Sequence, residues 1–564
     1  MKHTVGELVK EKTPRDVAKL RVLDPACGSG SFLIWAYQFL LDWHRDWYIE
    51  NLVPVFIDKK SVTDPAVLAL LPEATPRGKK HLVQAELPIY RAGTSGDATR
   101  TRSDWRLTTV EKKRILLNNI FGVDIDQQAV EVTKLSLLLK VLEEENEENI
   151  DKQLKLFAKR ALPSLHQNIK CGNSLIGTDI LTPEMSMEEV KRINPFDWSK
   201  EFAPVMVAGG FDAVIGNPPY LRIQGLQEHY EEQIPYLIEK YQSAVKRFDL
   251  YLLFVEKGYC LLSSKGLLSY ICPHKFLNSD FGSGLRNFFV KNCALASIVS
   301  FGNNLIFKTA TTYTGIFKLR RAKQSKFLYF EFPLLPIIEI PEKLSSLKAE
   351  MYSEFSISDF STDPWSLTST HSQSFLDKLN SSNRLKIEDV FAEIMVGVQS
   401  GIDNIHLLTE TTTISSKKDV LTLFSEKAGE VIEIEKDLVK PILMGEDVHR
   451  YQKIQNNHFV IYPYKLVGNK TVILEESELK TKFPIGYAYL KKYQSELREI
   501  RIRQKTNPKF WYSCHRSKDM YLFEQERIIT PEISLGCNMT ISPAGIYHNT
   551  KVYSIIADQK FSEH

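Results

Sequence analysis

Near its N-terminus the chain contains the run Arg21-Val22-Leu23-Asp24-Pro25-Ala26-Cys27-Gly28-Ser29-Gly30-Ser31. The apolar start of this run predicts a short strand, and residues 31–41 after the glycines predict a helix. The glycines allow a tight turn in which backbone N–H groups approach a bound anion at the helix N-terminus. The run is therefore a strand–turn–helix unit of an α/β fold.

The spacing of the glycines narrows the kind of anion that this turn can bind. It is not Gly-x-Gly-x-x-Gly, and no Gly-Lys-Ser/Thr follows, which argues against a dinucleotide site and against a phosphate-binding loop. A methionine carboxylate suits the turn, and the alternative is a tight loop without a ligand. The candidate cofactor-binding residues in this run are Asp24, Pro25, Ala26, Cys27, Gly28 and Gly30.

A second strand–helix unit places polar side chains after the predicted strand 120–123. Asp124 follows this strand directly, where a carboxylate can accept hydrogen bonds from ribose hydroxyls. The alternative role is a helix N-cap, which Asp126 fits better because it lies closer to the helix predicted at 129–142. Asn173 follows a weaker strand at 168–170, and its amide suits hydrogen bonding to an adenine ring of the cofactor. A plain turn is nearly as good an interpretation of Asn173.

The most specific motif is Asn217-Pro218-Pro219-Tyr220, which follows the predicted strand 211–216. An amine on an aromatic ring is a poor nucleophile, because its lone pair is delocalised into the ring. The Asn217 side-chain oxygen and the Pro218 carbonyl can accept both amine hydrogens and direct the lone pair towards a methyl donor. Pro218 and Pro219 hold these acceptors rigidly, since their φ angles are fixed.

Tyr220 offers a flat face on which a base swung out of a nucleic-acid duplex can stack. No general base is needed before methyl transfer from a sulfonium, because the sulfonium is already an activated leaving group. Catalysis then rests on orientation and electrostatics. The alternative for the tetrapeptide alone is a surface turn.

The remaining elements predict a mostly parallel sheet with helices on both faces. Strands are expected at residues 266–272, 294–301 and 311–319, and an apolar helix at 249–262. We expect a catalytic domain at residues 1–322 with an insertion at about 42–113, a connector at 323–378, and a mixed α+β domain at 379–564.

Composition excludes several classes of protein. The 564 residues are 43% hydrophobic and 25% charged, which is typical of a globular protein, and the net charge of +3 does not by itself indicate nucleic-acid binding. No uncharged apolar run approaches the length of a membrane span, and the N-terminus lacks the pattern of a secretory signal. The cysteines show no metal-binding spacing, so no metal is predicted. We expect a cytoplasmic protein without a membrane partner.

With these motifs in this order, the chain resembles the gamma-class adenine-N6 DNA methyltransferases of type II, especially type IIG, restriction-modification systems. The resemblance extends to Asp249-Leu250-Tyr251 and Phe254, to Pro273, and to Phe301-Gly302 leading to Phe307. It implies a Rossmann-like fold that binds S-adenosyl-L-methionine, in a bacterial or archaeal cytoplasm. It also implies duplex DNA as substrate, and a restriction endonuclease domain or subunit outside this chain as a further partner.

The resemblance also assigns aromatic residues. In this family an aromatic late in the domain packs on the flipped adenine opposite the catalytic tyrosine, and Phe307 is the nearest match. Tyr313 is a rival, and a core position for Phe307 is an equal alternative. Phe254 matches a position that touches the cofactor adenine, although a residue in an apolar helix is more often part of the core.

The C-terminal part resembles a DNA target-recognition domain. It opens with Gly397-Val398-Gln399-Ser400-Gly401 and continues with Lys440-Pro441-Ile442-Leu443-Met444-Gly445. The stretch Arg498–Tyr512, followed by Arg516, mixes basic and aromatic residues that can hold phosphates and stack on exposed bases. The alternative for this stretch is a solvated basic face.

The chain lacks several sequence features that members of the family have. Relatives have a Tyr-Thr-Pro type segment ahead of the Gly-rich turn, and Lys12-Thr13-Pro14 is not a convincing substitute. No nuclease motif is found, and relatives continue beyond the residues that end at His564. We therefore expect a family member lacking material at both ends that binds the cofactor weakly or not at all by itself. Two alternatives stay open: a non-catalytic DNA-specificity protein, and a methyltransferase acting on RNA or on protein glutamine.

Overall fold

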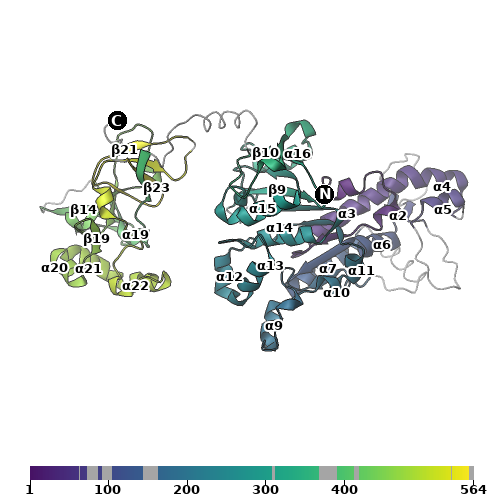
Figure 1. The fold of residues 1–564 in the computed structure, drawn as a ribbon, viewed down its shortest axis with the longest axis horizontal. Helices are drawn as coiled ribbons and strands as arrows, with labels where there is room; N and C mark the ends of the chain where they lie inside the picture. The colour runs from purple at the N-terminus through teal and green to yellow at the C-terminus, as the bar shows by residue number, and fades with distance from the viewer. Residues whose placement is uncertain are drawn as a thin grey trace. The chain divides into compact units, whose positions relative to one another are not determined.

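The structure is a computed structural model that describes residues 1–62, 64–72, 87–91, 105–143, 163–307, 312–367, 390–411, 418–534 and 536–557. The chain divides into two compact units, residues 1–374 and 375–564 (Figure 1). The predicted run of Gly, Thr, Ser and Arg at 91–106 lies mostly outside the described residues, as do the C-terminal residues 558–564.

Unit 1 is built around a nine-stranded sheet. Its strands, in spatial order, are β11 (Ser353–Ser356), β10 (Lys326–Glu331), β8 (Leu295–Ser300), β9 (Thr314–Arg320), β7 (Leu262–Pro273), β6 (Phe211–Gly216), β1 (Val22–Asp24), β4 (Ile120–Asp124) and β5 (Ile169–Cys171). The pairs β7–β6, β6–β1, β1–β4 and β4–β5 are parallel. β9 runs antiparallel between β7 and β8, and β11 runs antiparallel to β10. The predicted α/β fold with a mostly parallel sheet is confirmed.

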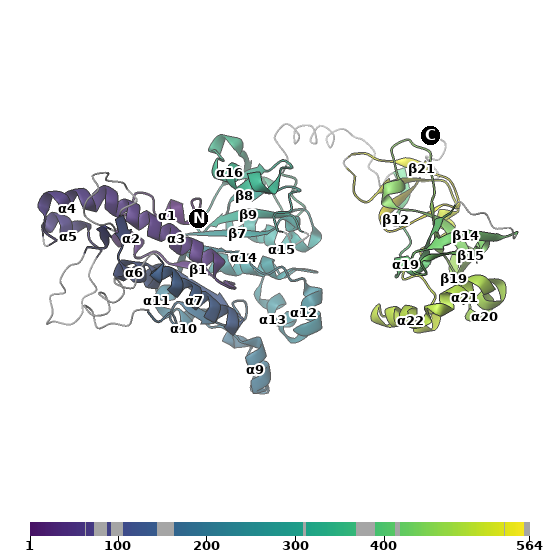
Figure 2. The ribbon, with the colours of Figure 1, turned by 180° about the vertical axis from the view of Figure 1, so that it is seen from behind.

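Successive residues of the central strands point into two different cores, because side chains alternate along a strand. Val22 packs into one core with helices α3 (Ser31–Trp47), α6 (Thr109–Asn119) and α7 (Gln127–Leu142). Leu23 packs into the other, which includes α14 (Leu250–Cys260) and α15 (Ser283–Asn292). Figure 2 shows these two groups of helices on either side of the strands, as predicted.

The other helices of unit 1 are short. They are α1 (Val5–Leu8), α2 (Pro14–Val17), α4 (Val53–Lys59), α5 (Pro65–Leu70), α9 (Met187–Ile193), α10 (Trp198–Glu201), α11 (Ala203–Val207), α12 (Ile223–His229), α13 (Ile234–Lys240) and α16 (Ile340–Ser345). A hairpin of β2 (Ile89–Arg91) and β3 (Trp105–Leu107) also belongs to this unit. The helix expected at 31–41 is longer than predicted, because α3 continues to Trp47. A π-helical turn, Tyr48–Leu52, then connects it to α4.

Two segments differ from the expected organisation. Part of the expected insertion at 42–113 belongs to the fold, because Tyr48, Leu52 and Leu107 are buried in the same core as α3. The expected connector at 323–378 instead contributes β10 and β11 to the sheet. β10 pairs with β8, and the buried Phe327 on β10 packs among the aromatic residues of the core. Both differences arise because apolar side chains in these segments find partners that local periodicity does not reveal.

Unit 2 combines short strands and helices, an α+β composition. A six-stranded sheet contains β15 (Glu430–Glu435), β14 (Val420–Ser425), β13 (Leu407–Glu410), β17 (His458–Ile461), β16 (Val439–Leu443) and β22 (Tyr547–His548). A four-stranded sheet contains β12 (Phe391–Val396), β23 (Val552–Ala557), β20 (Arg527–Pro531) and β21 (Thr540–Ser542), and a hairpin contains β18 (Tyr464–Val467) and β19 (Lys470–Ile473). The helices are α19 (Asp403–His406), α20 (Glu476–Lys482), α21 (Pro484–Lys492), α22 (Gln494–Arg503) and α23 (Met520–Phe523).

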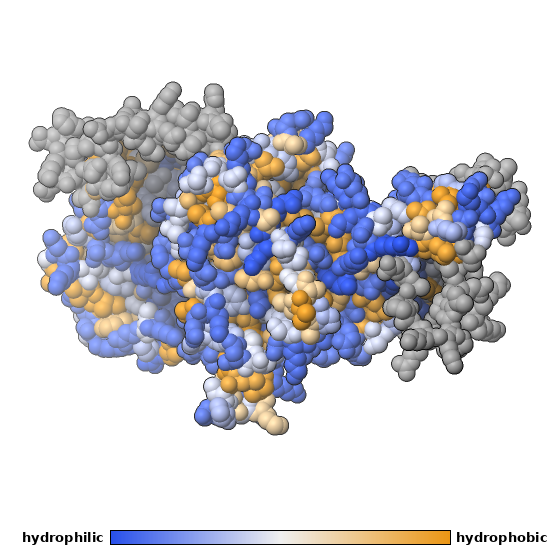
Figure 3. Space-filling view, turned by 45° about the vertical axis from the view of Figure 1, so that its right-hand side comes forward, coloured by the Kyte–Doolittle hydropathy of each residue, from blue (hydrophilic) through white to orange (hydrophobic). Residues whose placement is uncertain are grey.

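The face of the molecule in Figure 3 is mostly hydrophilic (blue), with apolar patches (orange) scattered among the hydrophilic residues. Within the described ranges, no helix is both long and apolar enough to cross a bilayer. In the same ranges, no group of three His, Cys, Asp or Glu side chains is arranged to hold a metal ion.

Candidate cofactor and substrate site

The predicted site residues gather at one edge of the sheet in unit 1. The strands β5, β4, β1 and β6 are neighbours and parallel, so their carboxyl ends lie at the same edge. Asp124 ends β4 and Asp24 ends β1, while Asn173 follows β5 and Asn217 follows β6. The structure thus brings together residues that are up to 193 positions apart, counting from Asp24 to Asn217.

The Gly-rich turn after β1 is fixed by hydrogen bonds to its neighbours. The Gly28 N–H donates to Asp124 Oδ2 (2.8 Å), and Thr133 Oγ1 on α7 donates to the Gly28 carbonyl (2.8 Å). The Cys27 N–H donates to the Val123 carbonyl (3.0 Å). Gly28 and Gly30 have φ angles of +53° and +84°, which side chains disfavour. Both glycines are therefore needed for the shape of the turn.

Asp24 is buried at the base of this turn. Its Oδ1 accepts a hydrogen bond from the Ala26 N–H (3.1 Å), and its side chain is 2% exposed. Burial raises the pKa of Asp24 to about 7 against the lowering effect of the Ala26 hydrogen bond, and the charge of Asp124 contributes to this rise. A Cβ placed on Gly216 would lie 2.7 Å from Asp24 Oδ1. The turn after β1 and the strand that leads into Asn217 are thus in direct contact.

Asp124 and Asp126 make different hydrogen bonds, and the N-cap role predicted for Asp126 is confirmed. Asp126 is the N-cap of α7, and its Oδ1 accepts from the Gln128 N–H (2.8 Å). Asp124 is half-buried and holds the Gly28 N–H on one oxygen and the Asp126 N–H (3.0 Å) on the other. Between them, the side chain of Ile125 is 50% exposed at the sheet edge. Sequence reasoning missed Ile125, whose only signal is its position between two aspartates.

The loop after β5 is tied to the Gly-rich turn through Ser174. Ser174 Oγ donates to the Pro25 carbonyl (2.5 Å) and is a further contact that sequence reasoning missed. Asn173 is half-buried, and its Oδ1 accepts from the Leu175 N–H (3.1 Å), which is the turn-forming role considered for it. This bond leaves the amide Nδ2 donors of Asn173 available to a ligand.

The residues of the turn fit a ligand that carries a carboxylate and hydroxyl groups. Helix α3 begins after Gly30 without a side-chain N-cap, so its first N–H groups and its dipole favour an anion. A Cβ on Gly28 would meet nothing within 4 Å, so the turn is open on this side. The half-buried carboxylate of Asp124 is an acceptor for hydroxyl groups. This set of groups matches the amino-acid and ribose parts of S-adenosylmethionine.

Asn217 and Tyr220 are joined by a short hydrogen bond. Tyr220 Oη lies 2.5 Å from Asn217 Oδ1 and 3.2 Å from the Ile271 carbonyl on β7. Asn217 and Tyr220 are half-buried and Pro218 is buried, whereas Pro219 is exposed. An amide oxygen has two lone pairs, so Asn217 Oδ1 keeps one for a second donor.

Tyr220 packs against the buried Tyr251 and lies near the side chains of Cys272 and Asp249. The ring of Tyr251 on α14 contacts Tyr220 edge-on, with 6.0 Å between the ring centroids. Burial raises the pKa of Tyr220, and the neighbouring Cys272 and Asp249 raise it further. Burial also raises the pKa of Asp249 to about 6. Tyr220 is therefore a neutral hydrogen-bond donor over the physiological pH range.

The aromatic candidates of the resemblance have different surroundings. Phe254 on α14 is 7% exposed and belongs to the core, which matches the core alternative. Phe307 is half-buried after the end of β8, and Tyr313 precedes β9 with 45% of its surface exposed. The ring centroid of Tyr313 lies 6.4 Å from that of His274, which follows β7. Both Phe307 and Tyr313 thus lie at the sheet edge that carries Asn217, and Phe307 remains the predicted adenine contact.

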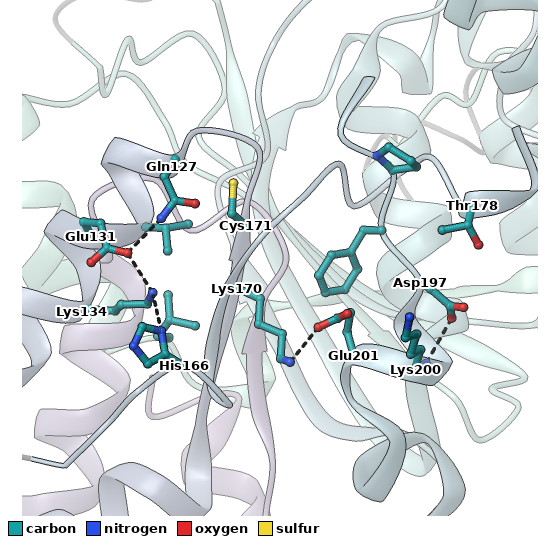
Figure 4. A pocket seen from close by; sticks show the side chains of 14 residues that line it. Gln127, Glu131, Lys134, His166, Lys170, Cys171, Thr178, Asp197, Lys200 and Glu201 are labelled. Atoms are coloured by element: carbon teal, nitrogen blue, oxygen red, sulfur yellow. Dashed lines mark hydrogen bonds and ion pairs between the residues drawn. The ribbon is translucent and has the colours of Figure 1, made fainter. Parts of the chain in front are cut away.

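A cavity of about 370 Å³ lies beside the edge strand β5. Figure 4 shows Gln127, Glu131 and Lys134 of α7 on one side and Lys200 and Glu201 of α10 on the other. Lys170 on β5 pairs with Glu201 (2.8 Å), and Lys134 pairs with Glu131 (2.9 Å). Two lysines of the cavity are thus held in ion pairs, and none of the predicted site residues lines it.

Comparison with known proteins identifies the same class that the motifs indicate. Residues 118–307 match the family described as Eco57I restriction-modification methylase. The chain is 28% identical over 527 residues to the type II restriction enzyme and methyltransferase RM.Eco57I of Escherichia coli, covering 92% of this chain and 46% of that protein. It is 23% identical over 363 residues to the type II methyltransferase M.BstVI of Geobacillus stearothermophilus, covering 61% and 59%.

Among solved structures, the type IIL restriction-modification enzyme MmeI in complex with DNA aligns with a TM-score of 0.55 and 12% identity. That alignment covers 96% of this chain and 57% of MmeI, and it shows a shared fold. The chain spans about half the length of the curated relatives named here. The predicted resemblance to methyltransferases of type II restriction-modification systems is confirmed.

Proposed function

We propose that this protein transfers a methyl group from S-adenosylmethionine to the N6 amine of an adenine flipped out of duplex DNA. The observation that carries the proposal is the contact between Asp24 and Gly216, which sets Asn217-Pro218-Pro219-Tyr220 beside the Gly-rich turn. Cofactor-binding and amine-binding groups then share one sheet edge. The similarity to type II methyltransferases supports this assignment.

The acceptor groups orient the amine. Asn217 Oδ1 and the Pro218 carbonyl accept the two amine hydrogens, and the fixed φ angles of the prolines hold both oxygens in place. The hydrogen bond from Tyr220 Oη keeps the amide oxygen, and not the amide nitrogen, turned to the site. The ring of Tyr220 stacks on the flipped base, and Phe307 closes the opposite side.

The cofactor residues are Asp24, Pro25, Ala26, Cys27, Gly28, Gly30, Asp124 and Asn173, with Ile125 as an apolar surface for the cofactor adenine. When bound there, S-adenosylmethionine would supply a methyl group whose bond to the sulfonium breaks as the amine attacks, leaving a neutral thioether, so the amine need not lose a proton beforehand. The protein therefore contributes orientation and a partly water-excluded setting, and the amine loses its proton after transfer.

Unit 2 serves in this proposal as the DNA target-recognition domain. The protein acts in the cytoplasm of a bacterium or archaeon as the modification part of a restriction-modification or phage-defence system. A nuclease in another domain or subunit would cleave DNA that lacks the methyl group.

The substrate class is tested by offering three acceptors in parallel. The protein is incubated with methyl-labelled S-adenosylmethionine and either unmethylated duplex bacterial DNA, total RNA or a protein extract. We expect label in the DNA alone. Label in RNA or protein instead would overturn the DNA assignment, and label in none of them at millimolar cofactor would favour a non-catalytic specificity protein.

A further inference from the structure

Two loops of unit 2 form one connected surface, which we call the double loop. The first loop, residues 444–457, joins β16 to β17, and the second, of which residues 532–534 and 536–539 are described, joins β20 to β21. Three hydrogen bonds link the two loops and the start of β21. They run from Asn538 Nδ2 to the Val448 carbonyl (2.8 Å), from the Tyr451 N–H to the Met539 carbonyl (3.3 Å), and from Thr540 Oγ1 to the Gln452 carbonyl (3.0 Å).

The double loop packs against a small hydrophobic cluster of its own, which fixes the backbone that carries the side chains at its tip. Val448 is 1% exposed and packs with Leu443, Ile529 and Val552, which come from three strands below the loops. The three residues after Val448 are His449, Arg450 and Tyr451, and all are exposed. The chain thus turns from a buried anchor to an exposed tip within one residue.

Tyr451 has an unusual combination of properties at this tip. It is 83% exposed, although a tyrosine ring contributes to stability mainly when it is buried. Its φ angle is +55°, a left-handed conformation that a bulky side chain disfavours. The Arg450 guanidinium lies 4.9 Å from the centroid of its ring. Strain and exposure of this kind persist where function requires them, and glycine or asparagine would fit the backbone better.

The surroundings of this pair favour a nucleic acid as ligand. A cavity of about 520 Å³ lies between the two loops, lined by His449, Arg450, Asn538 and the 86% exposed Ile533 among others. Two of the three neighbouring carboxylates are engaged within the protein: Asp447 accepts from the Met444 N–H (2.7 Å), and Glu532 pairs with Lys551 (3.3 Å). The third, Glu446, is exposed and also lines the cavity.

The stretch in which the sequence predicted stacking on bases is arranged differently. Trp511 and Tyr512 are 1% and 0% exposed and belong to the core of unit 2, and Arg501 on α22 is also buried. These aromatic rings are therefore not available to a base, whereas the ring of Tyr451 is.

We infer that the double loop recognises the bases of the DNA target, with Arg450 and Tyr451 as specificity-determining residues. The inference rests on the proposed function of the protein. An arginine guanidinium donates in pairs to guanine O6 and N7 in the major groove, and an exposed aromatic ring stacks on or wedges against bases. The cavity between the loops gives the edge of a base room to enter.

The test uses binding selection, so that its outcome does not depend on methylation. The full-length protein is mixed with a pool of duplex DNA with a randomised central segment, and the bound duplexes are sequenced after several rounds. The variants are Arg450→Ala, Tyr451→Ala and Tyr451→Gly. The control is Lys470→Ala, which removes a positive charge from the exposed β18–β19 hairpin of the same unit.

We expect the wild type and Lys470→Ala to enrich the same sequence. Arg450→Ala should lose the preference at one or two positions of that sequence, with about tenfold or greater loss of enrichment there. Tyr451→Gly should weaken binding while its Tm equals or exceeds that of the wild type, because glycine relieves the backbone strain. This result separates loss of recognition from loss of folding.

The inference is overturned if Arg450→Ala and both Tyr451 variants enrich the wild-type sequence to within twofold, or if the wild type enriches no sequence at all. A wild type that enriches a sequence without methylating it would refute the proposed function and leave this inference standing. If the double loop bound a protein and not DNA, the wild type would enrich no sequence.

Discussion

The Asp24 carboxylate lies against the backbone of Gly216, with 2.7 Å between Asp24 Oδ1 and the point where a Cβ would be. Asp24 closes the strand that leads to the Gly-rich turn, and Gly216 closes the strand that leads to Asn217. In the proposed reaction, this contact sets the separation between the methyl donor and the target amine. A glycine is required at position 216 because any side chain would push the two loops apart.

Gly216→Ala should therefore reduce methyl transfer at least tenfold and lower the stability of unit 1. Asp24 cannot easily swing away, since it is buried and bonded to Ala26, so the added methyl group overpacks the site at a cost of about 1–3 kcal/mol. Thermal unfolding and initial rates of methylation measure the two effects. Gly6→Ala is the matched control, because its Cβ would make only ordinary contacts of 3.4 Å or more. Activity of Gly216→Ala within twofold of the wild type would contradict the account.

Asp124→Ala and Asp126→Ala should affect different properties of the protein, namely cofactor affinity and stability respectively. Loss of the Asp124 carboxylate frees the Gly28 N–H and removes a ribose acceptor, so the dissociation constant for S-adenosylmethionine should rise at least tenfold. Loss of the Asp126 cap should lower stability by about 1 kcal/mol and leave that constant nearly unchanged. Calorimetric titration and thermal melts of both variants distinguish the roles, and equal effects on cofactor affinity would show the assignment to be wrong.

The stability of the protein should depend on pH through Asp24. Its pKa is raised to about 7 in the folded protein, whereas it is near 3.8 when unfolded. Between these values the folded state holds a proton that the unfolded state has lost, so this group lowers stability as pH rises from about 4 to about 7. Asp24→Asn removes this dependence. The Tm of Asp24→Asn relative to wild type should be higher at pH 8 than at pH 4.5, and a constant difference would refute the prediction.

The ring and the hydroxyl of Tyr220 should contribute separately to catalysis. Tyr220→Phe keeps the stacking face but loses the hydrogen bond to Asn217 Oδ1, so we expect a decrease of about fivefold in kcat, which corresponds to about 1 kcal/mol. Tyr220→Ala also loses the stacking surface for the flipped base, and its kcat/KM should fall by a further tenfold or more. If Tyr220→Phe were as impaired as Tyr220→Ala, the ring would have no independent role.

Much of this site was predictable because strand ends and motifs coincide. The strand 211–216 was predicted with the bounds that the structure shows, and the carboxyl ends of β1, β4 and β6 carry the predicted Asp24, Asp124 and Asn217. Parallel strands bring their ends together irrespective of the number of residues between them. The short bond between Tyr220 and Asn217 could not be predicted, because it depends on a side-chain rotamer.

Burial was harder to predict than secondary structure. The helix at α7 was expected from the spacing of Val132, Leu135, Leu138 and Leu139. Of these, Leu138 packs against the core, whereas Val132, Leu135 and Leu139 are 48%, 58% and 57% exposed. The buried face of α7 instead includes Thr133 and Leu137, because Thr133 bonds the Gly-rich turn. Likewise, the aromatic residues Trp511 and Tyr512 were expected at a surface and are core residues. In both cases the tertiary partner decides which face is buried.

The most direct test of the account is to identify the nucleoside that the protein modifies. Unmethylated duplex DNA is treated with the protein and excess S-adenosylmethionine, digested to nucleosides and analysed by mass spectrometry. The account predicts N6-methyladenine with the wild type and with a control variant at an exposed position, Asn278→Ala, and none with Asn217→Ala. Methylated cytosine, or N6-methyladenine that persists with Asn217→Ala, would contradict it.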